Sequence, residues 1–237
     1  MMKSTEEYRD SLRSYNPRVF IDGRQIENVA DEPLLQPGIN GIGITYDYAS
    51  KSEFAPLMLA REQETGKMVN RLLHIDRTTD DLLAKLEAIR ILCCEAGCVQ
   101  RYLVHDAFNG LYQATKRCDA EEGTEYFERF RDFMMEVQDK DLSYGIAMTD
   151  AKGDRSKKPH QQKHIDSYLH IVEERPDGIV ISGTKAIVTS APYMHGFIVM
   201  PCRAMTPDDT AFAVCCAVPV DAEGITISAR PAGRPGE

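Results

Sequence analysis

The sequence predicts an α+β chain in which a helical part, residues 1–141, precedes a β-rich part, residues 142–237. Two patterns predict this order. Before about residue 142, apolar residues mostly recur at the spacing that places them on one side of a helix. After it, they come in short runs separated by turn residues, as in strands. Runs of helices followed by runs of strands indicate an α+β fold or two domains.

The helical part opens with two local signals. Ser4 and Glu7 have the spacing of a capping box, so a helix is expected to begin after Ser4. Asp22-Gly23 lies between two short extended runs. This predicts a small hairpin over residues 18–27, because both central residues of such a turn need positive φ.

The clearest helix is expected to begin after Thr78, which forms a second capping pair with Asp81. Gly97 is expected to end or interrupt it. Its apolar residues are predicted to share one side: Leu82, Leu83, Leu86, Ile89 and Leu92. Two further helices are expected over residues 98–116 and 124–138.

The β-rich part contains several strand candidates separated by turn sequences. The clearest turn is Arg175-Pro176-Asp177-Gly178, which lies between two apolar runs. The predicted strands are residues 168–172, 179–182, 186–189, 197–200, 212–218 and 225–228. The Pro- and Gly-rich tail, residues 229–237, is expected to be a loop, which suggests that the sequence stops inside a larger architecture.

Composition excludes some function classes. A net charge of −9 over 237 residues argues against a general nucleic-acid binder, which needs a basic face. No apolar run approaches the roughly 20 residues that cross a bilayer, and the polar start is not a secretory signal. Seven scattered cysteines do not resemble a disulfide framework. We therefore expect a reduced, cytoplasmic protein that binds neither nucleic acid nor membrane.

The most informative segment for chemistry is the polar run over residues 147–156. Gly153 permits a close backbone approach to a ligand, and Lys152 and Arg155 place positive charge in an acidic chain. Such a loop suits a diphosphate or the polar edge of a flavin. A solvated surface turn would have the same residue types, and the segment is not a Walker or Rossmann motif.

A second candidate is formed by Cys98, Tyr102 and His105. On a continuous helix these residues would share one face, where a thiol, a phenol and an imidazole could build a metal or acid–base site. A buried helix whose cysteines act as small apolar residues is the alternative. His195 lies in an apolar stretch and is expected to be a satisfied core or pocket histidine.

Several segments, in the same order, resemble one family of flavoproteins. This family has an acyl-CoA-dehydrogenase-like scaffold and includes the 4-hydroxybutyryl-CoA dehydratases and the 4-hydroxyphenylacetate monooxygenases. The resemblance rests on residues 8–13, 18–20, 79–82, 106–109, 147–155, 177–186 and 198–206. It spans nearly all of this chain but only about the first half of a typical member.

The resemblance implies a helical N-terminal domain, a β-barrel middle domain and a C-terminal helical bundle that is absent from this chain. It also implies bound FAD and a homotetramer, or a partner that supplies the C-terminal half. Tyr102 and His105 would lie on the substrate side as catalytic residues. The residues implied to contact FAD are Met148, Thr149, Asp150, Lys152, Gly153, Asp154, Arg155, Ile187, Val188 and Thr189.

The chain is most similar to the dehydratase branch, whose members also bind a [4Fe–4S] cluster. Cys98 matches the first cluster cysteine, but Tyr102 stands where the second is expected. The other two ligands belong to the half that this chain does not include. Because a phenolate is a poor substitute for a thiolate on such a cluster, the resemblance leaves a bound cluster doubtful.

The implied reaction is dehydration of 4-hydroxybutyryl-CoA to crotonyl-CoA, isomerisation of vinylacetyl-CoA, or both, by a flavin radical mechanism on an acyl-CoA thioester. The alternative is a monooxygenase that uses reduced flavin to hydroxylate phenols such as 4-hydroxyphenylacetate. Against it, Leu103, Ala107 and Ile146 stand where that branch has its substrate-binding Arg, Tyr and His. A third possibility is an inactive fragment or a subunit that needs a partner.

Overall fold

The computed structural model describes residues 2–98 and 101–230. Its helices are α1 (Thr5–Arg13), α2 (Gln36–Ser50), α3 (Ala55–Met58), α4 (Thr79–Ala96), α5 (Tyr102–Glu122) and α6 (Tyr126–Asp139). Its strands are β1 (Val19–Ile21), β2 (Arg24–Ile26), β3 (Leu59–Arg61), β4 (Met68–Asn70), β5 (Tyr144–Ala147), β6 (His170–Arg175), β7 (Gly178–Ser182), β8 (Gly196–Val199), β9 (Cys216–Pro219) and β10 (Ile227–Ala229). Within these ranges, none of the helices combines the length and apolar character needed to cross a bilayer.

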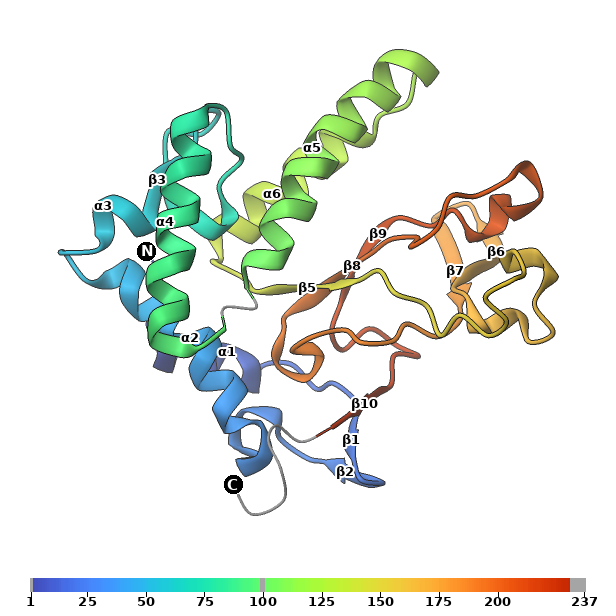
Figure 1. The fold of residues 1–237 in the computed structure, drawn as a ribbon, viewed down its shortest axis with the longest axis horizontal. Helices are drawn as coiled ribbons and strands as arrows, with labels where there is room; N and C mark the ends of the chain where they lie inside the picture. The colour runs from blue at the N-terminus through green and yellow to red at the C-terminus, as the bar shows by residue number, and fades with distance from the viewer. Residues whose placement is uncertain (1, 99–100, 231–237) are drawn as a thin grey trace.

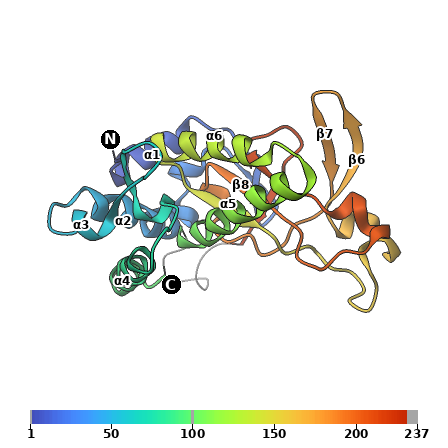
Figure 2. The same ribbon diagram turned by 90° about the horizontal axis from the view of Figure 1, so that it is seen from above.

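The predicted α+β order is confirmed, since the long helices all precede β5 (Figure 1). Within residues 2–98 and 101–230 the strands form four small sheets, ordered β10-β1-β2, β3-β4, β5-β8-β9 and β6-β7. The strands of the described residues do not close into a barrel. The β6–β7 hairpin projects from one end of the molecule (Figure 2).

Both capping boxes lie where the sequence places them. Ser4 caps α1 together with Glu7, and Thr78 caps α4 together with Asp81. The Asp-Gly hairpin is also confirmed, because the turn between β1 and β2 has positive φ at Asp22 and Gly23. These features depend on contacts between residues close in sequence, which is why the sequence predicts them well.

The predicted apolar side of α4 is only partly buried. Ala88 and Leu92 are buried against α2 and α3. Leu82, Leu83 and Leu86, in contrast, are 45%, 58% and 60% exposed. The predicted sharing of one side therefore does not mean that this side is buried along the whole of α4. The covering elements reach only its C-terminal half, and helical spacing cannot show how far a neighbour extends.

The helical and β-rich parts share their apolar cores. One core cluster joins Tyr8 and Tyr46 from the helices to Met194 and Phe197 near β8. A second joins residues of α5 and α6 to β5 and β8. The strands β1 and β10, far apart in sequence, pair in parallel. The domain boundary predicted after residue 141 stays a prediction.

Three predicted elements need correction. Residues 212–218 were expected to form one strand, but a 3₁₀ helix, Pro207–Phe212, precedes the shorter strand β9. Residues 186–189 do not form a strand, because Ile187 has a φ of 59°. The predicted helix from Cys98 begins only at Tyr102. Residues 231–237 of the predicted C-terminal loop lie outside the described residues.

Gly183, just after β7, approaches the backbone of a neighbouring segment. Its φ is +139°, and an added Cβ would lie 2.5 Å from Leu169 Cα and 2.6 Å from Tyr168 O. We expect Gly183→Ala to lower the free energy of unfolding by roughly 3 kcal/mol or more, because strain and a backbone clash add. The check is urea denaturation of the variant and the wild type. Gly224→Ala is the matched control, since Gly224 also has positive φ but open space around it. Equal losses for the two variants would show that the clash contributes nothing.

Candidate functional site

The loop after β5, residues 148–155, pairs with the residues that directly precede the second segment predicted to contact the cofactor, residues 187–189. The pairing joins residues 149–151 to residues 184–186. Ala186 N donates to Thr149 O at 2.7 Å, and Ala151 N donates to Thr184 O at 3.2 Å. Asp150 and Lys185 form an isolated antiparallel bridge. The structure therefore brings together two groups of residues that are more than thirty positions apart in the sequence.

A buried ion pair holds the loop in place. The Asp150 carboxylate is almost fully buried, and its Oδ1 lies 2.7 Å from Lys185 Nζ. It also accepts hydrogen bonds from Leu169 N and Cys202 Sγ. Lys185 Nζ donates in addition to the carbonyl oxygens of Met148 and Met200. The Asp150 side chain thus points into the protein and holds the loop in its conformation. It does not face the solvent-exposed side of the loop, where a ligand could bind.

The outer surface of the loop combines exposed side chains with strained backbone. Ile187 is 86% exposed and Met148 is 44% exposed. Lys152, Ile187 and Ser190 have positive φ without being glycine. For a β-branched residue such as Ile187 this conformation is a true outlier. Strain of this kind is found disproportionately at ligand-binding sites, so the surface is a candidate binding site.

The remaining predicted loop residues have different environments. Asp154 is engaged locally, since its carboxylate accepts from Ser156 N and Oγ. Gly153 has a φ of +50°, and an added Cβ would lie 2.5 Å from Gln162 Oε1, the end of a flexible side chain. The side chains of Lys152 and Arg155 form no hydrogen bond or ion pair with another described residue, and Arg155 is exposed. Thr149 and Val188 are half-buried, whereas Thr189 is exposed.

Two cavities lie elsewhere in the molecule. One, of about 20 Å³, lies between the β3–β4 turn and helices α5 and α6, and the other, of about 390 Å³, lies beside Met2, Lys67 and Asp139. Neither touches residues 148–155. Neither of these two cavities therefore marks a ligand site beside the loop.

Cys98, Tyr102 and His105 do not share one helical face. Helix α4 ends at Ala96, and α5 begins at Tyr102. The prediction of one continuous helix through all three is therefore wrong. Cys98 is exposed after α4, Tyr102 is half-buried beside the α2–α4 core, and His105 is fully buried. The reason is Gly97, whose φ of 73° ends α4 and redirects the chain.

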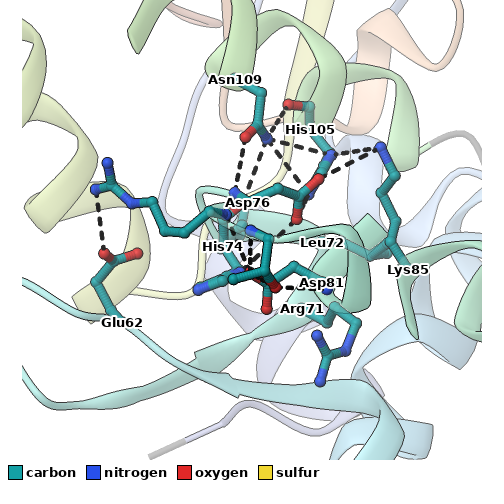
Figure 3. Close-up of polar contacts among 12 residues, drawn as sticks. Glu62, Arg71, Leu72, His74, Asp76, Asp81, Lys85, His105 and Asn109 are labelled. Atoms are coloured by element: carbon teal, nitrogen blue, oxygen red, sulfur yellow. Dashed lines mark hydrogen bonds and ion pairs between the residues drawn. The ribbon is translucent and has the colours of Figure 1, made fainter. Parts of the chain in front are cut away.

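His105 belongs to a buried polar cluster between α4 and α5 (Figure 3). Its Nε2 lies 3.3 Å from Asp76 Oδ1, and its Nδ1 lies 3.3 Å from Lys85 Nζ. Asn109 Nδ2 is 3.4 Å from the same Nδ1. Asn109 Nδ2 lies equally near Nε2, so the donor and acceptor roles of the two ring nitrogens depend on the tautomer. Burial lowers the pKa of His105, although the Asp76 carboxylate acts in the opposite direction.

The cluster contains polar atoms that no described residue satisfies. Both carboxylate oxygens of Asp76 and Nδ1 of His74 are buried without a hydrogen-bond partner among the described residues. Lys85 Nζ lies 3.7 Å from Asp76 and 3.0 Å from Asp106. Sequence spacing alone could not identify this cluster, because Asp76 and Lys85 are 29 and 20 residues before His105.

A second buried network was also missed by sequence reasoning. Arg101 and Asp141 form a fully buried ion pair at the junction of α5 and β5. His195 is 1% exposed and makes two hydrogen bonds: Ser143 N donates to its Nδ1 at 2.9 Å, and its Nε2 lies 2.8 Å from Ser11 Oγ. The prediction that His195 is a satisfied core histidine is confirmed. Nothing in the local sequence around Arg101 indicated its burial.

This chain alone does not supply a full set of ligands for a [4Fe–4S] cluster. Among residues 2–98 and 101–230, no three His, Cys, Asp or Glu side chains gather in a way that could hold a metal ion. Tyr102 lies where the resemblance implies a second cysteine. Cluster coordination normally requires thiolates, which a phenol replaces poorly.

Comparison with known proteins identifies related sequences over almost the whole chain. The profile of the family described as 4-hydroxyphenylacetate 3-hydroxylase N terminal matches residues 4–237. The 4-hydroxybutyryl-CoA dehydratase/vinylacetyl-CoA-Delta-isomerase of Clostridium aminobutyricum is 41% identical over 95% of this chain. The oxygenase component of 4-hydroxyphenylacetate 3-monooxygenase from a Geobacillus strain is 27% identical over 97% of it.

Solved structures give the same order of similarity. An oxygen-tolerant archaeal 4-hydroxybutyryl-CoA dehydratase from N. maritimus aligns with a TM-score of 0.92 at 37% identity, over 95% of this chain and 45% of its own. The oxygenase component HpaB of 4-hydroxyphenylacetate 3-monooxygenase, complexed with FAD, aligns with a TM-score of 0.82 at 19% identity, over 97% of this chain and 47% of its own. The chain spans about half the length of the curated relatives that it matches, 46% and 47% for the two named above.

Proposed function

This chain belongs to the 4-hydroxyphenylacetate 3-hydroxylase N-terminal family, and we propose on that basis that it is the N-terminal part of an FAD-dependent enzyme acting on CoA thioesters. The proposed reaction is dehydration of 4-hydroxybutyryl-CoA to crotonyl-CoA, Δ-isomerisation of vinylacetyl-CoA, or both. The observation that carries the proposal is the 41% identity to a dehydratase/isomerase, against 27% to a monooxygenase component.

FAD is proposed to lie on the outer surface of residues 148–155 and 187–189. The adjoining backbones, the exposed Met148 and Ile187 and the positive-φ residues support this place. Lys152 and Arg155 would attract the diphosphate, since their cationic groups have no partner among the described residues. When bound, FAD supplies reversible electron transfer with the substrate.

Tyr102 and His105 remain the proposed catalytic side chains, although one is half-buried and the other is fully buried. Tyr102 begins α5 and is half-buried, so its phenol can line a substrate pocket completed by another part of the protein. His105 would hold or move a proton beside Asp76, whose Oδ1 lies 3.3 Å from its Nε2. Because the cluster donors are incomplete in this chain, the proposed reaction includes no step at an iron–sulfur cluster.

The finer architecture is also a proposal. We propose that the small sheets after residue 141 form part of an acyl-CoA-dehydrogenase-type barrel, and that a C-terminal helical bundle completes the site. The TM-scores of 0.92 and 0.82 over nearly the whole chain support this arrangement. A homotetramer, and a reduced cytoplasmic location, are proposed with it.

The test is to purify the full-length protein anaerobically, record its visible spectrum, and count iron and acid-labile sulfide. Turnover is then measured with 4-hydroxybutyryl-CoA and with vinylacetyl-CoA. Bound flavin with turnover of either thioester is the expected result. Bound flavin without turnover of either thioester would contradict the proposed activity but support the proposed FAD binding.

A phenol monooxygenase is the second candidate, favoured by the fold shared with HpaB. It predicts weak binding of oxidised flavin and phenol-dependent oxygen uptake once reduced flavin is supplied. A chain that binds no flavin and turns over neither class of substrate would instead be an inactive fragment, or a subunit that needs a partner.

The proposed flavin surface predicts a specific effect of Ile187. Ile187→Gly is expected to change the free energy of unfolding by less than about 1 kcal/mol, because relief of φ strain offsets the added chain entropy. FAD affinity should fall roughly tenfold, since burying an isoleucine is worth about 1.5–3 kcal/mol. Equilibrium dialysis with FAD measures this. Val172→Ala, at a 53% exposed position on β6, is the control and should leave FAD affinity unchanged.

A further inference from the structure

Arg101 is the largest fully buried side chain among the described residues. It lies immediately before α5, next to Tyr102. A fully buried guanidinium is expensive in free energy unless its charge is paired and its N–H groups find acceptors. Its partners therefore show which parts of the chain it holds together.

The Arg101 guanidinium contacts two other segments of the chain. Its Nη2 donates to the Asp141 carboxylate and, at 3.2 Å, to Leu142 O, which connect α6 to β5. Its Nη1 lies 3.4 Å from Thr45 Oγ1 on α2. The guanidinium also lies 4.0 Å from the centroid of the Tyr46 ring, a cation–π distance. Arg101 thus joins the start of α5 to α2 and to the residues that lead into β5.

The same network continues to the second cofactor segment. Tyr46 Oη donates to Asp141 O at 3.0 Å and lies 2.8 Å from Ser143 Oγ. Ser143 in turn exchanges two hydrogen bonds with His195, which directly precedes β8. Strands β5 and β8 pair in parallel, with Tyr144 opposite Gly196. Residues 148–155 leave the end of β5, and residues 187–190 lie a few positions before His195.

We propose that Arg101 is a positioning residue that fixes Tyr102 at the start of α5 relative to both cofactor segments. This inference rests on the proposed function, because the distance between Tyr102 and the cofactor segments affects catalysis only if these parts form the active site. Stability alone is a weak reason for such a pair, since well-packed apolar residues often replace buried ion pairs without loss. A planar guanidinium can donate in several fixed directions at once, which a lysine ammonium cannot reproduce.

The test uses Arg101→Lys and Arg101→Met in the full-length, FAD-bound protein. Arg101→Lys keeps the charge but loses the fork geometry. We expect its kcat with vinylacetyl-CoA to fall by about 10²-fold, as a displacement of about 1 Å can cause, while KM and FAD affinity change by less than about threefold. The kcat of Arg101→Met should fall by at least the same factor.

Arg71→Met is the matched control. Arg71 is also buried, and its guanidinium donates to the carbonyl oxygens of Leu57 and Leu59, which lie at the end of α3 and the start of β3. The Arg71→Met variant should lower the free energy of unfolding but leave kcat close to that of the wild type. Arg101→Lys with kcat within about twofold of wild type, or an equal kcat loss in Arg71→Met, would overturn the inference.

Amide hydrogen exchange separates failure of this inference from failure of the proposed function, because it needs neither FAD nor turnover. In Arg101→Lys, protection should fall together in residues 105–110, the first amides of α5 with acceptors inside the helix, and in residues 142–149. Loss of protection in residues 105–110 alone overturns the proposed link, even in a protein that binds no flavin. A joint loss supports the link, and the wild-type flavin and turnover assays then decide the activity separately.

Discussion

Lys185→Met is expected to lower the free energy of unfolding by about 3–5 kcal/mol, because it leaves the buried Asp150 carboxylate without its counter-charge. The variant also loses the two hydrogen bonds that Lys185 donates to Met148 O and Met200 O. Residues 148–155 should then detach from residues 184–190, and FAD affinity should fall with stability. Urea denaturation measures the first effect, and equilibrium dialysis with FAD measures the second.

Lys67→Met is the control for this prediction. Lys67 Nζ contacts both carboxylate oxygens of Asp139 at 2.7 and 2.8 Å, but the two side chains are 57% and 49% exposed. Exposed ion pairs contribute only about 0–1 kcal/mol, so this variant should be nearly as stable as the wild type. Similar losses for Lys67→Met and Lys185→Met would show that burial of the Asp150 pair has no special effect.

Acid is expected to destabilise the fold through His195. Burial lowers the pKa of this imidazole to about 3, and the positive charges of Lys3 and Arg101 act in the same direction. In the unfolded chain the pKa returns to about 6.5, so the unfolded state binds a proton that the folded state does not. Stability therefore falls as the pH drops from about 6.5 toward 3, by up to about 1.4 kcal/mol per pH unit for this group.

Comparing the wild type with His195→Gln isolates this contribution. Urea denaturation at several pH values between about 4.5 and 7.5 should show a smaller pH slope in the variant, because glutamine does not titrate. His105, whose pKa is also lowered by burial, adds to the slope in both proteins and cancels in the difference. Identical slopes would mean that His195 is protonated in the folded state, against its buried position.

Local sequence patterns predicted the fold where neighbouring residues decide it. The capping boxes at Ser4 and Thr78 and the turn at Asp22-Gly23 lie as expected. Local sequence patterns did not show how exposed a side chain is where a distant element decides this, as for Leu82 and Leu86 on α4. Helical spacing shows which residues share a side, but not whether another element covers that side.

The candidate site shows the same division. The sequence predicts residues 148–155 and 187–189 as cofactor contacts, and the structure pairs the first segment with residues 184–186, directly before the second. The roles within the loop could not be predicted. Asp150 is turned inward to Lys185, and this follows from a contact between residues 35 positions apart.

By itself, the sequence determined the order of helices and strands, the ends of the best-capped helices, and the resemblance to flavoproteins. All of these depend on neighbouring residues or on motifs in a fixed order. Only the tertiary structure decided that Arg101 pairs with Asp141, that His105 lies against Asp76, and that Cys98 and Tyr102 are on separate elements. A buried charge is tolerated only when a partner of opposite charge lies within contact distance. For partners far apart in sequence, the number of residues between them does not give that distance.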